Sequence, residues 1–333
     1  MDNANSGSAG KKLFGQLNFQ RFLALAALVI IYVFFCIFGN NFLSTTSLIN
    51  ILDSSYYIGF LAIGVTFAII TGGIDLSIGT VMMTSALIGG VAYNKGAPIA
   101  LALLICVISG ALFGLLNGII ISKFGLVPFV ATLGVQMVAS GFGAIVSNVQ
   151  TIRYPTVGTE DAWFKQVLYK TSSGFPIGIV WLVIFFIIAY VILNKMRMGR
   201  YTFALGSNEE SARLSGVDVS KWKILVYVIV GAFTGMAGVM YAAAYTTIVP
   251  VTGAGMEILG IAAVVIGGTS LSGGVGSLTG TIIGVYIMAV LKQGLMSMGL
   301  QGHYQTFFTG IVVIAAVMLD IYRNKKSSKV KKA

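Results

Sequence analysis

Two short glycine-rich turns carry side chains that could take up a proton or a cation, or contact a substrate. Residues 72–77 read Gly-Gly-Ile-Asp-Leu-Ser and residues 267–272 read Gly-Gly-Thr-Ser-Leu-Ser, so both follow the pattern GGxxLS, which suggests two related halves. An acidic group in apolar surroundings usually has a task, although Asp75 could instead cap a following helix. The candidate residues are Gly72, Gly73, Asp75, Ser77, Glu257, Ser270 and Ser272.

Hydrolytic and metal chemistry lack the residues that they need. The chain has one histidine, His303, and its two cysteines, Cys36 and Cys106, both lie in apolar stretches. A Ser-His-Asp or Cys-His set needs a histidine beside a nucleophile, and a metal site needs several ligands. The phosphate-binding pattern GxxxxGK[ST] does not occur. We expect no catalytic residue, no metal and no cofactor, and predict that the chain is not an enzyme.

The composition places these residues in a membrane. Of the 333 residues, 57% are hydrophobic and only 9% are charged, whereas soluble domains carry about 25% charged residues. So few charges cannot cover the surface of a water-soluble protein of this size. A backbone in lipid must satisfy its own hydrogen bonds, and a helix does so within one segment. We therefore predict an all-α polytopic membrane protein.

Uncharged runs define about ten spans, since a spanning helix needs about 20 apolar residues. The predicted spans are 22–38, 56–70, 78–93, 98–121, 127–149, 175–194, 224–247, 256–268, 277–297 and 305–322. The segments 56–70 and 256–268 are short, as is typical of broken helices around a transport site. The membrane domain is then 21–322, flanked by tails at 1–20 and 323–333.

The positive charges indicate the orientation. The net charge is +11, but the lysines and arginines lie at span ends, which favours the positive-inside rule over nucleic-acid binding. The tails 1–20 and 323–333 and the segment 195–223 hold most of these residues. We therefore expect both termini and the segment 195–223 in the cytoplasm, which requires an even number of spans.

A short polar helix is predicted within that cytoplasmic segment. Ser207 and Glu210 fit a capping box, and Gly216 suits the residue after a helix end, which gives about two helical turns. This helix is either a solvated loop helix or a docking element for a cytoplasmic partner. The candidate docking residues are Ser207, Asn208, Glu209, Glu210, Arg213 and Gly216.

Taken together, four stretches resemble one family of transporters. Residues 70–79, 127–134, 199–217 and 261–274 are similar to motifs of the ABC-type monosaccharide importer permeases, the ribose, galactose, xylose and arabinose group, and ribose permeases look most similar. The resemblance covers roughly residues 20–322. It implies the fold of type II ABC importers, with short broken helices, and makes 207–216 the family's cytoplasmic coupling helix.

The resemblance also implies partners and a location. A second permease copy or homologue, an ABC ATPase at the cytoplasmic face and an extracytoplasmic sugar-binding protein would complete the transporter, in the plasma (inner) membrane of a prokaryote. The surrounding partner is the lipid bilayer, and no nucleic acid is expected. The family commonly has Tyr-Glu-Leu-Asp before Ile-Ala-Ala, whereas Leu259 stands here in place of the aspartate. That difference bears on substrate identity.

Two other functions fit part of the pattern. An ion-coupled secondary transporter could use Asp75 or Glu257 as a proton or sodium site. A transporter of the same family could carry a nucleoside or a signalling furanose in place of a monosaccharide. The polar helix at 207–216 favours the ATP-driven importer, because a secondary transporter needs no docking helix.

Overall fold

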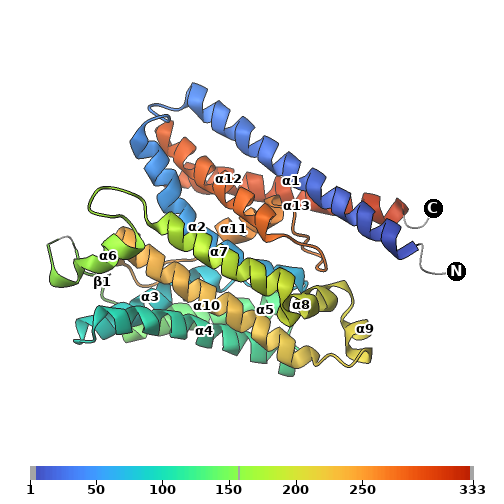
Figure 1. Ribbon diagram of the computed structural model, residues 1–333. Coiled ribbons are helices and arrows are strands. Elements are labelled where there is room, and N and C mark those ends of the chain that lie inside the picture. Colours follow the sequence, from blue (N-terminus) through green and yellow to red (C-terminus); the bar gives the residue numbers. More distant parts are fainter. Residues whose placement is uncertain (1–4, 157, 331–333) are drawn as a thin grey trace.

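The computed structural model describes residues 5–156 and 158–330; the side chains of 5–21, 316, 319–320 and 322–330 lie outside the description. Helices make up most of the described chain (Figure 1). The long and medium helices are α1 (Asn5–Phe38), α2 (Thr45–Ile70), α3 (Ile78–Asn94), α4 (Ile99–Lys123), α5 (Pro128–Val146), α7 (Gly178–Lys195), α8 (Arg197–Ser207), α10 (Val219–Tyr245), α11 (Met256–Ile266), α12 (Leu278–Ser297) and α13 (Gly302–Val330). The short elements are β1 (Ile152–Arg153), the 3₁₀ helix η1 (Glu160–Ala162), α6 (Trp163–Leu168), α9 (Glu209–Leu214) and β2 (Thr247–Ile248).

The predicted all-α membrane architecture is confirmed. Ten helices in the described ranges correspond to the ten predicted spans, namely α1 to α5, α7 and α10 to α13. Six helices of the described chain are long and apolar enough to cross a membrane by length and composition, and three shorter apolar helices accompany them. The helix α1 already begins in the predicted N-terminal tail, and α13 continues into the predicted C-terminal tail. Residues 1–4 and 331–333 lie outside the described residues.

The start of α2 differs from the prediction. The expected span 56–70 was short because Asp53 interrupts the uncharged run, but α2 has 26 residues and begins at Thr45. The Asp53 carboxylate accepts a hydrogen bond of 2.6 Å from the hydroxyl of Tyr169, so the charge has a partner within the protein. The prediction of a short helix at 56–70 is therefore wrong.

The break in the backbone lies directly after α2. Residues 73–77 belong to no helix or strand, and α3 begins only at Ile78. A Cβ built on Gly260 of α11 would lie 3.2 Å from the Cβ of Leu61 and 3.5 Å from the Cδ1 of Ile78. Leu61 lies more than two turns before the end of α2, so α3 begins inside the bundle, beside the middle of α2. The predicted short helix at 256–268 is confirmed as α11, with 11 residues.

The bundle has two distinct ends (Figure 1). At the end that we name the α9 end lie α8, α9, the first turns of α1 and the last turns of α13. At the opposite end, named the β1 end, lie α6 and β1, which pairs with β2 through Ile152 opposite Ile248 and Arg153 opposite Thr247. The first and the last of the ten helices that correspond to the predicted spans both have their outer ends at the α9 end, in agreement with the predicted even number.

Glycines allow a close helix contact in the core. The helices α4 and α10 approach so closely that a methyl group on Gly110 or Gly114 would collide with the backbone of Gly231. Lipid supplies no hydrophobic driving force for helix association. Small residues at the contact compensate, because they let the two backbones pack closely. The pair α4–α10 packs beside α2, which is the most buried of the six candidate spans together with α12.

Candidate functional site

Asp75 lies in the segment 73–77 that follows α2 and is almost completely buried, with 1% of its surface exposed. Its Oδ1 accepts hydrogen bonds from the backbone N–H of Ser77 at 2.9 Å and from the Ser77 hydroxyl at 2.6 Å. Its Oδ2 accepts one from the side-chain amide of Asn117 in α4 at 3.3 Å, and the same amide donates to Ser77 Oγ at 2.9 Å. The carboxylate is thus fixed between two elements.

Asp75 does not occupy the capping position of α3. The residue at that position is Ser77, which makes no capping bond through its own side chain. Asp75 instead closes a local turn around Ser77, the pattern known as an Asx turn. The interpretation of Asp75 as the cap of the third helix is therefore wrong in its geometry.

Thr132 in α5 binds the same segment, 73–77, from another side. The backbone N–H of Leu76 donates to Thr132 Oγ1 at 3.1 Å, and the Thr132 hydroxyl donates to the carbonyl oxygen of Ile74 at 3.3 Å. A non-helical segment inside a helix bundle lacks the regular backbone hydrogen bonds of a helix, so other groups, such as this side chain, must satisfy its backbone. Our candidate set did not include Asn117 or Thr132. The available signals were a lone amide in an apolar span and a threonine inside the motif 127–134.

Glu257 lies in the first turn of α11 and is buried. Both of its carboxylate oxygens accept the backbone N–H of Gly255, at 2.9 and 3.0 Å, in the position where a helix N-terminus favours negative charge. A methyl group on Gly79 would collide with Glu257 Oε2 and with the carbonyl oxygen of Gly253. The first turns of α3 and α11 therefore touch, and the elements that carry Asp75 and Glu257 are neighbours.

The two GGxxLS turns are not equivalent position by position. After α2 the residue with positive φ is Gly72, at +80°, and after α11 it is Gly268, at +92°. Both helices end in a Schellman motif, with hydrogen bonds of 3.1 Å from Gly73 N to Ala68 O and from Thr269 N to Val264 O. Gly72 thus matches Gly268, the second glycine of its pair, so the alignment by GGxxLS is wrong by one residue.

Three segments meet at the α9 end of the bundle. The backbone N–H of Gly274 donates to the carbonyl oxygen of Ile70 at 2.8 Å. A methyl group on Gly206, near the end of α8, would collide with that same carbonyl, and one on Gly274 would lie 2.8 Å from Ser207 Oγ. We name this meeting of the end of α2, the end of α8 and the loop 272–274 the junction.

Ser270 and Ser272 belong to the loop that forms the junction. The backbone N–H of Ser272 donates to Ser270 Oγ at 3.2 Å, and the N–H of Ser270 donates to the carbonyl oxygen of Val275 at 3.0 Å. The carbonyl oxygen of Ser272 would lie 3.8 Å from a Cβ on Gly72. These serines therefore shape the loop that packs against the first glycine-rich turn.

The polar segment at the α9 end contains two helices where one was expected. Ser207 is the last residue of α8, and the cap of α9 is Asn208, whose Oδ1 accepts the backbone N–H of Ser211 at 2.8 Å. The predicted capping box from Ser207 to Glu210 is wrong, because α8 continues through Ser207. The predicted end at Gly216 is confirmed: its φ is +82°, and its N–H bonds to the carbonyl oxygen of Arg213 at 3.0 Å.

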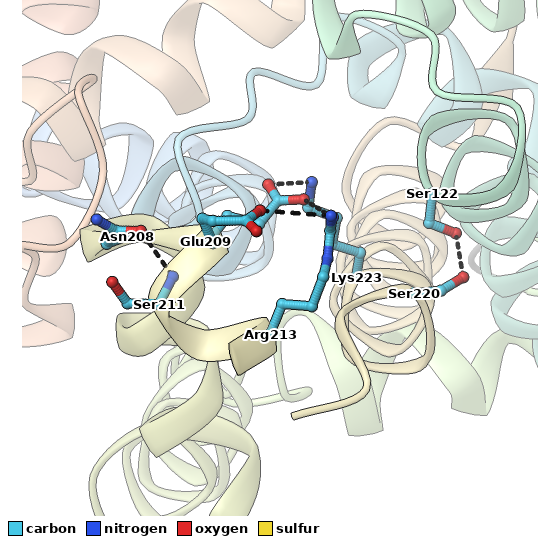
Figure 2. Close-up of polar contacts among 8 residues, drawn as sticks. Ser122, Asn208, Glu209, Ser211, Arg213, Ser220 and Lys223 are labelled. Atoms are coloured by element: carbon cyan, nitrogen blue, oxygen red, sulfur yellow. Dashed lines mark hydrogen bonds and ion pairs between the residues drawn. The ribbon is translucent and has the colours of Figure 1, made fainter. Parts of the chain in front are cut away.

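Charged side chains attach α9 to the bundle (Figure 2). Lys223 of α10 pairs with Glu209 at 2.6 Å, and Arg213 reaches Glu209 at 3.5 Å and Glu210 at 3.4 Å. A surface hollow of about 620 Å³ lies between α9, the start of α10 and the loop before α5. The pair of Glu209 with Lys223 joins α9 to α10, while the Glu210 side chain is 68% exposed and faces outward.

A helical bundle with two short helices that start inside it, and a polar helix pair at one end, defines a polytopic membrane transport subunit. The chain belongs to the family described as the permease component of branched-chain amino acid transport systems, whose model matches residues 47–317.

Individual relatives match nearly the whole chain. The ribose import permease protein RbsC of Escherichia coli K12 is 34% identical, over 96% of this chain and 98% of the relative. RbsC of Bacillus subtilis is 38% identical over 92% of each chain, and the fructose import permease protein FruG of Bifidobacterium longum is 30% identical over 95% of each.

A solved structure supports the fold. It is an ABC transporter described as metal-chelate type, in an inward-facing conformation, with a TM-score of 0.50 and 15% identity over 92% of this chain and 99% of that one. The predicted resemblance to ABC importer permeases is confirmed by the family and its relatives. The chain is the multi-pass permease subunit of an ABC importer and not an enzyme, with the ATPase in a separate subunit. Family membership implies an ATPase partner and a binding-protein partner.

Proposed function

We propose that this chain translocates a monosaccharide of the ribose type across the membrane, driven by ATP hydrolysis in a partner that docks on α9. The observation that carries the proposal is the junction: Gly206 packs on the Ile70 carbonyl, and Gly274 bonds to the same oxygen. A force on α9 passes through α8 to the end of α2 and to the loop after α11. Both of these connect to the segments that hold Asp75 and Glu257.

The coupling residues have separate tasks in this proposal. Asn208 and Gly216 set the two ends of α9, and the pair of Glu209 with Lys223 holds α9 against α10. Glu210, which is largely exposed, contacts the ATPase, while Arg213 joins both glutamates. Ser207 serves in the junction through its contact with Gly274. The helix α9 is attached to the bundle on one side only, and it transmits force from the ATPase to the bundle.

The pathway lies beside the first turns of α3 and α11. Helix N-termini inside a membrane protein present backbone N–H groups and a positive dipole end to a passing polar solute. Asp75, Ser77 and Glu257 lie at these N-termini, and Gly72, Gly73, Ser270 and Ser272 form the turns below them. A change at the junction alters the position of these two helix starts and so opens or closes the route.

The orientation follows from the charges. The α9 end faces the cytoplasm, together with the tails 1–20 and 323–333, and the β1 end meets the extracytoplasmic sugar-binding protein. The membrane is a prokaryotic inner membrane, and a second copy or a homologue lies beside the domain 21–322. The imported sugars named for the relatives support a monosaccharide. The alternative cargo is a nucleoside or a signalling furanose. The replacement of the family's aspartate by Leu259 is the reason to test it.

The test is reconstitution of the permease with its ATPase and binding protein in proteoliposomes. A thermal-shift screen of the binding protein against D-ribose, D-fructose and a set of nucleosides selects the cargo. We expect ATP-dependent accumulation of the selected sugar, with the ATPase retained on the purified permease. Binding of a nucleoside and of neither sugar would favour the alternative cargo. An ATPase that fails to associate with the permease would contradict the proposal.

A further inference from the structure

An ionisable residue that the proposed pathway does not use lies inside a span. Lys292 belongs to α12 and separates two uncharged runs, 258–291 and 293–319. In the described part of the chain its ammonium group takes part in none of the three ion pairs. Charged side chains within spans face the protein interior or water, and they commonly mark a substrate or ion route. The environment of Lys292 shows what it could bind.

Tyrosines from two helices surround Lys292. Its Nζ donates a 2.9 Å hydrogen bond to the hydroxyl of Tyr57 in α2. The Tyr57 ring contacts the rings of Tyr241 and Tyr245 in α10 at centroid distances of 5.5 and 6.3 Å, and those two rings lie 4.5 Å apart. Tyr57 is buried, Tyr241 is half-buried and Tyr245 is 42% exposed. The cluster therefore extends from the interior to the surface.

Asp53 adds a hydrogen-bond acceptor next to this cluster. It lies one turn before Tyr57 on the same face of α2. Its Oδ2 accepts the hydroxyl of Tyr169 at 2.6 Å, and burial raises the pKa of Tyr169, which keeps that hydroxyl protonated. Its Oδ1 is buried and has no hydrogen-bond partner within the described residues. A buried acceptor without a partner is unfavourable unless a ligand or water supplies one.

The cluster lies toward the β1 end of the bundle. Tyr245 is the last residue of α10, one residue away from the start of β2, and Lys292 lies in the last two turns of α12. The α9 end, with the junction and the two glycine-rich turns, is on the opposite side (Figure 1). In the proposed orientation, a sugar released by the binding protein meets this cluster before it reaches Asp75 or Glu257.

We propose that Lys292, Tyr57, Tyr241, Tyr245 and Asp53 form an entry site that binds a monosaccharide at the β1 end of the permease. The proposal rests on the proposed sugar-import function. Small-ligand sites combine aromatic walls with a few placed polar groups. A sugar offers C–H faces that pack on tyrosine rings and hydroxyls that both donate and accept. Lys292 has three donor hydrogens, of which Tyr57 takes one, and Asp53 Oδ1 is an acceptor for a sugar hydroxyl.

A purely structural role for Lys292 makes a different prediction. If Lys292 only joined α12 to α2 through Tyr57, its loss would affect every transported sugar equally. If it donates to a particular sugar hydroxyl, its loss would matter only for sugars that carry that hydroxyl, because a site built for a hydroxyl discriminates against the analogue that lacks it.

The experiment compares D-ribose with 2-deoxy-, 3-deoxy- and 5-deoxy-D-ribose in proteoliposomes that hold the complete transporter and ATP. We expect Lys292→Met to raise the apparent KM for D-ribose about tenfold, and to lower the preference for D-ribose over at least one deoxy analogue by a similar factor. Tyr245→Phe, at an exposed position where folding is not at risk, raises the KM less, and Tyr190→Phe on the exposed face of α7 is the matched control.

The possible outcomes distinguish a failure of the entry site from a failure of the proposed sugar-import function. Equal losses for all four sugars in Lys292→Met, or unchanged uptake, overturn the entry site while ATP-driven uptake by the wild type stands. If the wild type accumulates D-fructose and not D-ribose, the same comparison uses the deoxy analogues of D-fructose. A wild type that accumulates neither sugar contradicts the proposed cargo, and the entry site with it.

Discussion

Gly274 donates its backbone N–H to the carbonyl oxygen of Ile70 at 2.8 Å, which joins the loop after α11 to the last turn of α2. The last carbonyls of a helix have no partner within it, so they are available for such a bond. Gly206 packs on the same carbonyl from α8. The Ile70 carbonyl group therefore links the polar segment at the α9 end to both glycine-rich turns, although these three segments lie far apart in the sequence.

Gly206→Ala tests the junction. A methyl group there collides with the Ile70 carbonyl, and overpacking of this kind costs about 1–3 kcal/mol. We expect sugar uptake to fall on the order of tenfold while ATP hydrolysis continues, because α8 is displaced from the end of α2. The control is Gly141→Ala in α5, where nothing lies within 4 Å of the added methyl. Equal uptake by the two variants would remove the junction from the coupling route.

The double variant Glu210→Ala and Gly216→Val tests the docking helix. Valine is strained at the positive φ of residue 216, and the alanine removes an exposed carboxylate from the outer face of α9. We expect normal insertion into the membrane, and ATP hydrolysis that no longer drives uptake. Normal uptake with an unchanged amount of bound ATPase would refute the docking role.

Asp75→Asn and Asp75→Ala separate structure from transport. Asparagine keeps an oxygen for the two bonds from Ser77, and its amide nitrogen replaces Oδ2, the acceptor of the Asn117 amide. When the Asn117 amide turns over, that nitrogen donates to the buried Oδ1 of Asn117, which has no partner among the described residues. Alanine leaves the hydroxyl and the backbone N–H of Ser77 without their acceptor, at about 1–3 kcal/mol for each buried group. Thermal unfolding in detergent should show a loss for alanine only, whereas uptake should fall strongly for both. Wild-type uptake in the asparagine variant would limit Asp75 to a scaffold role.

Thr132→Val tests how α5 supports the segment 73–77. Valine matches threonine in shape but leaves the backbone N–H of Leu76 without an acceptor, which costs about 1–3 kcal/mol. We expect a lower melting temperature for Thr132→Val and a smaller change for Thr132→Ser, which keeps the hydroxyl. Thr306→Val on exposed α13 is the matched control. A melting temperature equal to that of the control would show that the segment needs no side chain from α5.

Much of the bundle can be predicted from the sequence because the contrast between lipid and water is local. The spans predicted at 78–93 and 277–297 agree closely with α3 and α12. The same rule fails where a charge has a partner that is distant in the sequence: Asp53 interrupts an apolar run but is held by Tyr169, so the start of α2 was placed too late. The start of α10 was also placed too late, because Asp218 caps it ahead of two lysines.

The site is only partly visible in the sequence. Asp75 and Glu257 are recognisable as acids in apolar surroundings, and Gly216 as a helix end. Asn117 and Thr132 reach the segment 73–77 only through the packing of α4 and α5, which no local pattern encodes. The true match of the two glycine-rich turns is hidden as well, since Thr71 lies between Ile70 and Gly72 but no residue separates Ile266 from Gly267.

Accumulation of the selected sugar with and without an imposed proton gradient tests the central claim most directly. Proteoliposomes hold the permease with its ATPase and binding protein. A protonophore is added while ATP is maintained on the side of the membrane where the ATPase lies. A proton-coupled carrier would depend on the membrane potential, since moving one charge through 100 mV supplies about 2.3 kcal/mol. We predict that uptake persists with the protonophore and stops without ATP. Accumulation that follows the gradient and needs no ATP would contradict the account.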